Sequence, residues 1–130
     1  MRYSQQRDLI LQSIRAVDTH PNAQDILTMV QSNFPTISMG TIYRNLSQLV
    51  NNKLILELTF NGVSHYDGNI YDHQHFYCTQ CKSIIDCNIT SSNILKKFLK
   101  STKHDAQNCQ ILFSGTCHDC KSKPKKEIAC

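Results

Sequence analysis

Cysteine and histidine residues concentrate in two short stretches of the 130-residue chain. Two histidines and one Cys-x-x-Cys pair fall within nine residues, and a second Cys-x-x-Cys pair lies far downstream: His73, His75, Cys78, Cys81, Cys117 and Cys120. Each Cys-x-x-Cys turn presents two thiolates, and two such turns complete the tetrahedral sulfur shell that zinc prefers. The sequence therefore predicts a structural zinc site at these four cysteines.

A pair of disulfides and a redox-active dithiol are the alternatives to zinc. The seven cysteines are an odd number, and the start of the chain, Met1-Arg2-Tyr3-Ser4-Gln5, does not resemble a secretory signal. We therefore favour zinc and expect a cytoplasmic protein. At Cys87, Cys109 and Cys130 we expect ordinary packed or tail thiols, with a thiol-based sensor at Cys130 as the alternative.

The two histidines are not needed by a zinc ion that already has four sulfur ligands. Residues i and i+2 of an extended segment point to the same side, so His73 and His75 can reach one ion. Asp67 lies upstream of them, and Asp86 follows Cys81 by five residues. Imidazole and carboxylate ligands together suit iron, manganese or zinc. The alternative is that these histidines lie on an ordinary polar surface loop.

Length and composition indicate a soluble chain with one domain or two very small ones. Apolar residues make up 40% of the sequence, and no apolar run approaches the roughly 18 residues that cross a membrane. The net charge of +4 permits nucleic-acid binding without arguing for it. We expect the lysine-rich tail that begins at Lys121 to be simply solvated.

The first half of the chain shows three segments of helical hydrophobic periodicity, followed by two segments typical of strands. We expect helices over residues 4–17, 23–33 and 39–51, and strands over residues 54–60 and 63–66. Asn61-Gly62 between the strands is the strongest short signal for a hairpin turn. Three helices followed by a hairpin is the order of a winged helix-turn-helix, in which the third helix enters the DNA major groove.

The expected third helix carries polar groups that could contact DNA. Ser38 suits the N-cap, and with Ile42 and Leu46 facing the core the polar side chains of the first turns point elsewhere. The candidate contacts to phosphates and base edges are Ser38, Thr41, Tyr43, Arg44 and Asn45. On periodicity alone, an ordinary solvated helix face explains the same pattern equally well.

Three longer motifs resemble the ferric uptake regulator (Fur) family of dimeric, metal-dependent bacterial transcription repressors. They are His20-Pro21-x-Ala23-x-x-Ile26, Phe34-Pro35-x-Ile37-Ser38-x-Gly40-Thr41-Ile42-Tyr43-Arg44-Asn45-Leu46 and His73-x-His75-x-x-Cys78-x-x-Cys81. The resemblance runs from about residue 3 to Cys120, with the motifs in the family's order and spacing. It implies an α+β protein, with a winged-helix DNA-binding domain over residues 1–66 and a small α/β dimerisation and metal-binding domain over residues 67–130.

The second half fits the expected dimerisation domain. Residues 83–88 and 108–115 are strand-like, and residues 91–101 carry a helical apolar stripe formed by Ile94, Leu95, Phe98 and Leu99. The resemblance implies structural zinc at the four cysteines. It also implies a regulatory iron or manganese site made by His20, Asp67, His73, His75 and Asp86. A site with ligands from both domains stabilises one arrangement of the dimer through its higher affinity for that arrangement.

Within the family, the chain most resembles the peroxide-responsive PerR type. Iron-uptake sensors usually carry glutamate where this chain has Asp67 and Asp86, whereas PerR-type sensors carry aspartate at both positions. The resemblance implies that peroxide oxidises a ligand histidine, His20 or His73, and that the repressor then leaves its operator. The chain has only two glutamates, so a general preference for aspartate also explains the pattern. An iron-responsive or other metal-uptake repressor is therefore the alternative.

Two features depart from the family pattern. The chain starts almost at the first core helix, without the family's extra N-terminal helix, so we expect weaker DNA binding or a greater dependence on the wing and the dimer. The family's second metal site in the dimerisation domain falls on Asp72, Gln74, Asn93 and Cys109. Because Gln74 and Asn93 are poor ligands, we expect this site to be empty or altered.

Two other functions compete with metal-dependent repression. A zinc metallohydrolase using His73, His75 and Asp86 would need an open metal position beside a general base, within a substrate cleft. The second half offers no spare carboxylate pair and little chain to shape a cleft, so we expect no enzymatic activity. A structural or RNA-binding winged helix is the remaining alternative.

Overall fold

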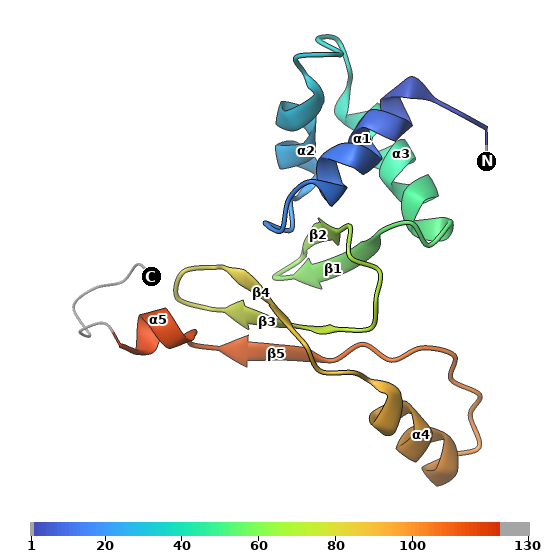
Figure 1. Ribbon diagram of the computed structural model, residues 1–130, viewed down its shortest axis with the longest axis vertical. Coiled ribbons are helices and arrows are strands. Elements are labelled where there is room, and N and C mark those ends of the chain that lie inside the picture. Colours follow the sequence, from blue (N-terminus) through green and yellow to red (C-terminus); the bar gives the residue numbers. More distant parts are fainter. Residues whose placement is uncertain (1, 123–130) are drawn as a thin grey trace. The chain divides into compact units, whose positions relative to one another are not determined.

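The computed structural model describes residues 2–122 and divides the chain into two compact units, Met1–Ile70 and Tyr71–Cys130 (Figure 1). The boundary lies after Ile70, beyond the expected position after Tyr66, and the exact extent of the two domains stays a prediction. Among the described residues, no helix has the length and apolar character needed to cross a membrane.

The first unit consists of three helices and a two-stranded antiparallel sheet. In chain order these are α1 (Gln5–Arg15), α2 (Ala23–Val30), α3 (Met39–Asn51), β1 (Leu56–Phe60) and β2 (Val63–Asp67). The expected winged helix-turn-helix is thereby confirmed. Asn61 and Gly62 both have positive φ angles, 50° and 76°, as a tight two-residue hairpin turn requires.

Helices α1 and α2 end two or three residues before the expected positions. After α1, the chain turns through His20, whose φ of 55° lies in the left-handed region. After α2, the backbone N–H groups of Asn33 and Phe34 both donate to the carbonyl of Val30, which closes a turn in place of a further helical turn. Val17, the last residue of the expected first helix, therefore lies beyond α1 and is exposed.

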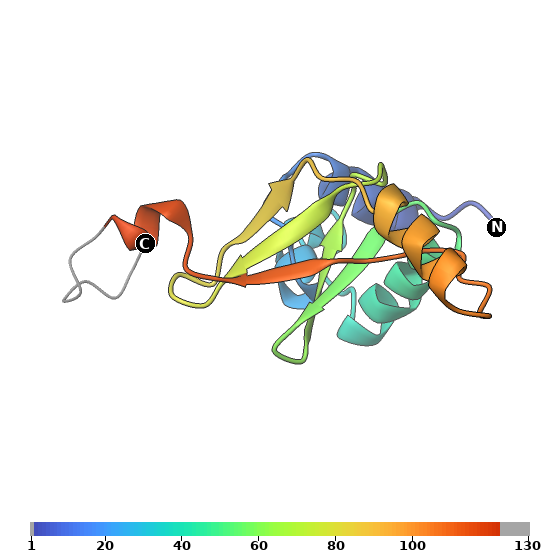
Figure 2. The ribbon, with the colours of Figure 1, turned by 90° about the horizontal axis from the view of Figure 1, so that it is seen from below.

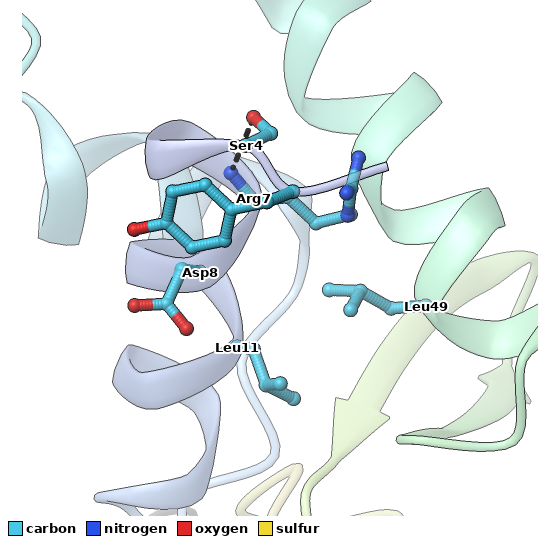
Figure 3. Close-up of a pocket in the computed structure, with 6 residues that line it drawn as sticks. Ser4, Arg7, Asp8, Leu11 and Leu49 are labelled. Atoms are coloured by element: carbon cyan, nitrogen blue, oxygen red, sulfur yellow. Dashed lines mark hydrogen bonds between the residues drawn. The ribbon is translucent and has the colours of Figure 1, made fainter. Parts of the chain in front are cut away.

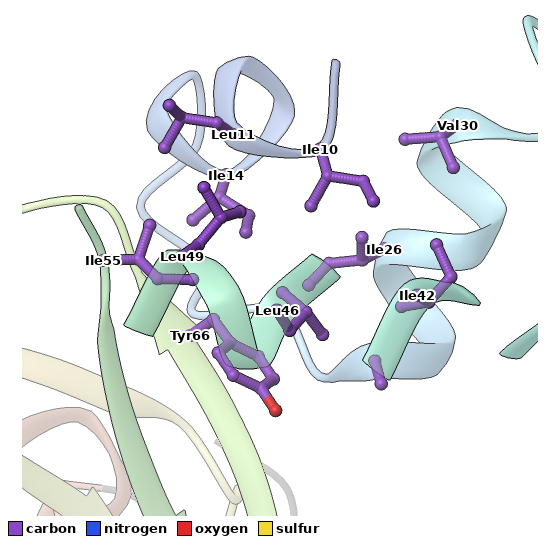
Figure 4. Packing of buried hydrophobic residues seen from close by; sticks show 11 residues of the cluster. Ile10, Leu11, Ile14, Ile26, Val30, Ile42, Leu46, Leu49, Ile55 and Tyr66 are labelled. Carbon is purple, nitrogen blue, oxygen red and sulfur yellow. The ribbon is translucent and has the colours of Figure 1, made fainter. Parts of the chain in front are cut away.

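The core of the first unit lies between the three helices and the hairpin (Figure 4). Its largest buried side chains come from all three helices and from the hairpin region: Ile10, Ile14, Ile26, Val30, Ile42, Leu46, Leu49, Ile55 and Tyr66. Each helix begins at a side-chain cap, provided by Ser4, Asn22 and Ser38. Apolar spacing and capping thus agree on where these helices lie.

A polar contact also fixes α1 against α3. The first turn of α1 borders an open pocket of about 210 Å³, lined in part by Arg7 and Leu49 (Figure 3). Ser4 caps this turn by accepting a hydrogen bond from Arg7 N at 3.3 Å. The buried Arg7 guanidinium donates to Gln48 Oε1 on α3 at 2.8 Å, which holds the two helices in register.

The second unit is built on a three-stranded sheet in the order β4-β3-β5 (Figure 2). β3 (Gln74–Cys78) is central and pairs antiparallel with β4 (Ile84–Cys87) and parallel with β5 (Leu112–Gly115). Helix α4 (Ser92–Ser101) connects β4 to β5, and the short α5 (His118–Lys121) follows β5. The expected strand over residues 108–115 begins later, because Ile111 N bonds to the side chain of Gln74 and not to the backbone of β3.

The second unit has a small interior of its own. Within residues 71–122, the buried hydrophobic side chains are Tyr77, Cys78 and Cys117. No residue of α4 other than its N-cap is buried, and three members of its apolar stripe, Ile94, Phe98 and Leu99, are 51%, 40% and 40% exposed. The stripe therefore forms a surface of the single chain.

Gly68, just after β2, provides a test of the packing in the first unit. A Cβ atom there would lie 2.9 Å from Arg15 Cα and 3.2 Å from Arg15 N. Because backbone atoms cannot move aside as a flexible side chain can, Gly68→Ala should lower the free energy of unfolding by about 1–3 kcal/mol in chemical denaturation.

Gly40→Ala is the matched control for this substitution. A Cβ atom at Gly40 meets nothing closer than 3.5 Å, and alanine stabilises a helix by about 1 kcal/mol relative to glycine. This variant should be neutral or more stable. Equal stabilities for the two variants would contradict the close approach at Gly68.

Candidate metal centres

Four cysteine sulfur atoms meet at one end of the sheet in the second unit. Cys78 ends β3 and Cys81 lies in the turn to β4. Cys117 is the N-cap of α5, and Cys120 lies within α5. The Sγ atoms are 3.7 Å apart for Cys78 and Cys120 and 3.9 Å apart for Cys81 and Cys117. All four lie within 4.8 Å of one another. In a tetrahedron with zinc–sulfur bonds of about 2.3 Å, neighbouring sulfurs are about 3.8 Å apart, so the four residues fit zinc.

Backbone amides surround these sulfurs in the way that thiolates require. Cys78 Sγ accepts from Cys81 N at 3.5 Å and from Cys117 N at 3.3 Å. Burial opposes ionisation of Cys78, but these N–H donors outweigh it and lower the pKa of the thiol to about 6. The backbone at this position thus favours the thiolate form of Cys78.

Cys117 differs in its ionisation from Cys78. Its sulfur accepts from Cys120 N at 3.5 Å, which favours the thiolate. Burial and the neighbouring sulfurs disfavour the ionised form of this thiol, and together they raise the pKa of Cys117. Four crowded sulfurs cannot all ionise without a compensating cation, and a divalent metal ion supplies that charge.

In the first unit, His20 and Asp67 form a buried pair. His20 Nε2 lies 3.4 Å from Asp67 Oδ2, and the two side chains are 2% and 7% exposed. The loop that carries His20 is attached to β2, because Tyr66 N donates to the carbonyl of Pro21 at 2.9 Å. After β2 the chain turns at Asn69, whose N–H donates to Asp67 Oδ1 at 2.9 Å and fixes the carboxylate.

In the second unit, His73, His75 and Asp86 converge. Nε2 of His73 and Nε2 of His75 lie 3.4 Å and 3.2 Å from the same atom, Asp86 Oδ1. The sheet explains this convergence, since His75 pairs directly with Asp86 across β3 and β4. His73 Nδ1 lies 2.7 Å from the carbonyl oxygen of Tyr71, which accepts the N–H and leaves Nε2 available as a ligand.

Both groups offer imidazole nitrogen and carboxylate oxygen as ligand atoms. His73 and His75 are buried at 7% and 2% exposure, so the alternative of surface histidines is wrong. Ligands that bind a metal at about 2.1 Å lie about 3.0–3.4 Å apart, which matches the separations within each unit. Imidazole nitrogen and carboxylate oxygen suit Fe²⁺ or Mn²⁺, whereas the sulfur cluster suits zinc.

The residues at the expected second dimerisation-domain site do not fit a metal ion. Asp72 accepts hydrogen bonds from Ser91 N at 3.1 Å, Ser91 Oγ at 3.1 Å and Gln74 Nε2 at 3.2 Å. Gln74, 1% exposed, accepts in turn from Ile111 N at 2.8 Å. The other two positions, Asn93 and Cys109, are exposed and half-buried, respectively. Hydrogen bonds here join β3 to the start of α4 and to the segment before β5.

The candidate DNA contacts on α3 divide into two groups. Ser38 Oγ caps the helix by accepting from Thr41 N at 3.1 Å, and Arg44 Nη2 donates to Thr41 Oγ1 at 2.9 Å. Arg44 and Tyr43 are exposed. Asn45 is buried, and its amide donates to the carbonyl of Thr41 at 2.9 Å.

Two serines near the candidate metal ligands were not predicted from the sequence. The Ser83 hydroxyl lies 3.0 Å from Cys81 Sγ, and Ser91 binds Asp72 at the start of α4. Ser83 follows Cys81 by two residues, a spacing that could have suggested it. Ser91 and Asp72 are far apart in sequence, and no local pattern connects them.

Removal of one thiolate tests the zinc assignment. Cys78→Ser should abolish stoichiometric zinc and lower the free energy of unfolding by several kcal/mol, because zinc binding is coupled to folding of the second unit. Zinc content by elemental analysis and thermal unfolding measure the two effects.

Cys87→Ser is the control, because Cys87 is a half-buried free thiol of the same sheet. It should keep its zinc and change stability by less than about 1 kcal/mol. A zinc-free Cys78→Ser protein as stable as the parent would contradict a structural role for the metal.

Comparison with known proteins identifies the family of this chain. The family model described as "Ferric uptake regulator family" matches residues 1–114. The peroxide-responsive repressor PerR of Staphylococcus aureus (strain USA300) is 31% identical over 125 residues, which cover 95% of this chain and 84% of that protein.

Solved structures share the fold. The Helicobacter pylori ferric uptake regulator Fur has a TM-score of 0.79 at 19% identity, over 95% of this chain and 84% of that chain. The Campylobacter jejuni peroxide stress regulator has a TM-score of 0.75 at 24% identity, over 88% of each chain. Fur-family repressors bind DNA and form dimers, and they are regulators, not enzymes, so the metallohydrolase alternative is wrong. This chain belongs to the ferric uptake regulator family of metal-responsive transcription repressors.

Proposed function

We propose that this chain is a cytoplasmic, peroxide-responsive repressor that binds an inverted-repeat operator as a dimer. The observation that carries the proposal is an aspartate beside a buried histidine in each unit, Asp67 with His20 and Asp86 with His73 and His75. Aspartate at both positions is the pattern of the PerR type. The 31% identity to the Staphylococcus aureus PerR repressor supports the same assignment.

In this proposal, five residues of both units hold one regulatory Fe²⁺ or Mn²⁺ ion: His20, Asp67, His73, His75 and Asp86. Support comes from the donor atoms, imidazole nitrogen and carboxylate oxygen, which suit these ions, and from their short separations within each unit. Ligands contributed by two units favour the arrangement in which all five can bind. Because the metal binds that arrangement more tightly than others, it raises the population of the arrangement and with it the affinity of the protein for DNA.

The sensing reaction consumes one ligand histidine. Ferrous iron held by these ligands would supply one-electron chemistry toward hydrogen peroxide beside His20 and His73. His20 and His73 are 3% and 7% exposed, so an oxidant from bulk solvent reaches them poorly and one generated beside them reaches them first. In the net change, one peroxide oxygen is added to an imidazole carbon and the other leaves as water. The oxidised ring is a poorer ligand, so the metal and then the operator are released.

DNA recognition is assigned to α3, with Arg44 as the main candidate for base contact. Thr41 orients the guanidinium through the 2.9 Å bond to Arg44 Nη2, and Tyr43 is exposed beside it. We assign Asn45 to holding the helix backbone, since its side chain is buried. A two-fold dimer presents two such helices, which fit related half-sites of an inverted repeat.

The apolar surface of the second unit is the proposed dimer interface. Its members are each at least 40% exposed: Ile85 and Phe113, which share a row of the sheet with Phe76, and Ile94, Phe98 and Leu99 of α4. A cluster of this kind is costly to leave in water, and a second copy of the chain is the partner that the family's dimeric state provides.

Arg44→Ala tests base recognition. If the guanidinium reads a base, the variant should lose about 1–3 kcal/mol of binding to the operator and little on random duplex DNA, as measured by fluorescence anisotropy at fixed salt. Arg44→Lys is the matched control, because it keeps the charge and loses the bidentate fork. Equal losses on both DNAs, restored by lysine, would make Arg44 a phosphate contact.

Oxygen incorporation separates peroxide sensing from iron sensing. After brief peroxide exposure of the Fe²⁺ form, tryptic mass spectrometry should show one added oxygen on His20 or His73. The Mn²⁺ form should be spared, because Mn²⁺ is a poor one-electron reductant of peroxide. Asp86→Glu should keep metal-dependent DNA binding and show less oxidation.

Two other outcomes of this experiment would change the assignment. Unmodified histidines with oxidised Cys87, Cys109 or Cys130 would move sensing to a thiol, and Cys130 lies outside the described residues. No modification at all would favour the iron-responsive alternative, which the low glutamate content of the chain keeps open.

A further inference from the structure

His20 is held in an unusual backbone conformation. Its φ of 55° lies in the left-handed region, which non-glycine residues seldom occupy without local support. Nδ1 of His65 lies 2.9 Å from the carbonyl oxygen of His20. A carbonyl can only accept, so His65 Nδ1 carries the proton and donates it. One imidazole side chain thus binds the backbone of the residue whose own imidazole faces Asp67.

His65 is itself fixed in place. It belongs to β2, pairs with Leu58 of β1 and is half-buried. Its ring lies edge-on to Phe60, with centroids 6.1 Å apart and planes at 63°. The donor therefore comes from the hairpin of the first unit, the same hairpin whose second strand ends at Asp67.

We propose that His65 is a positioning residue for the regulatory metal, acting through the backbone of His20. The inference rests on the proposed function, because it requires His20 to be a metal ligand. In this arrangement β2 supplies one ligand, Asp67, and orients a second, His20. Metal occupancy and the position of the hairpin wing are therefore coupled through one strand.

Two backbone contacts make the hypothesis testable without detaching the loop. Tyr66 N donates to the carbonyl of Pro21 at 2.9 Å, and Asn22 forms a bridge with the backbone of His65. Both survive replacement of the His65 side chain. Substitution therefore removes one hydrogen bond at His20 and leaves the loop joined to β2.

The experiment compares His65→Leu with His65→Asn in the full-length, zinc-loaded protein. Leucine is the better strand former but has no donor, whereas the asparagine amide can place an N–H near the position of Nδ1. Mn²⁺ affinity, measured by calorimetry, should fall about 10–100-fold in His65→Leu and recover largely in His65→Asn. The visible absorption of the Co²⁺ form should change in the leucine variant, and zinc content should stay at the parent value.

Variants of His20 separate this inference from the proposed function. If His20→Ala loses Mn²⁺ affinity and His65→Leu in that background causes no further loss, His65 acts through His20. If His20→Ala weakens binding but His65→Leu does not, the positioning role is overturned and the metal site stands. An asparagine variant as weak as the leucine variant also overturns it. Parent-like Mn²⁺ binding by His20→Ala overturns both.

Discussion

The second unit depends on the attraction between four thiolates and one divalent cation. Its described part buries three hydrophobic side chains, and two of them, Cys78 and Cys117, belong to the four-cysteine cluster that fits zinc. A segment of this size cannot obtain enough stability from so little buried apolar surface. The zinc shell joins the end of β3 to the segment after β5, two parts of the chain that would otherwise be held by one parallel strand pairing. The exposed apolar surface on α4 and its neighbouring strands is then covered by a second copy in the proposed dimer.

This cross-link leaves the other ligands free for a different kind of metal. The sulfurs are soft and enclosed by backbone N–H donors, whereas the other candidate ligands offer nitrogen and oxygen. Asp67, His75 and Asp86 lie on β2, β3 and β4, and His20 and His73 lie in the segments before α2 and β3. An ion at the cysteine cluster can therefore remain bound as part of the fold, while an ion at the histidine and aspartate ligands exchanges with the metal pool of the cell. The Asp72–Gln74–Ser91 hydrogen bonds fill a third location with protein groups, so that this part of the second unit needs no ion to join β3 to α4.

Features that depend on residue spacing along the chain could be predicted from the sequence. The two Cys-x-x-Cys pairs, the three amphipathic helices and the Asn61-Gly62 turn all follow from local patterns, and each is present in the structure. Alternation along the extended segment that enters β3 likewise places His73 and His75 on the same side. Contacts between residues that are far apart in the sequence could not be predicted from local sequence patterns. Neither the bond from His65 to the His20 carbonyl nor the burial of Asn45 has a signature in sequence, because each depends on how helices and strands pack.

X-ray absorption at both metal edges of one Zn²⁺- and Mn²⁺-loaded sample tests the separation of soft and hard sites most directly. We expect four sulfur neighbours at about 2.3 Å around zinc, and a shell of nitrogen and oxygen alone around manganese, with the outer scattering of imidazole rings. Sulfur in the manganese shell, or fewer than four sulfurs around zinc, would contradict the assignment of two chemically distinct metal centres.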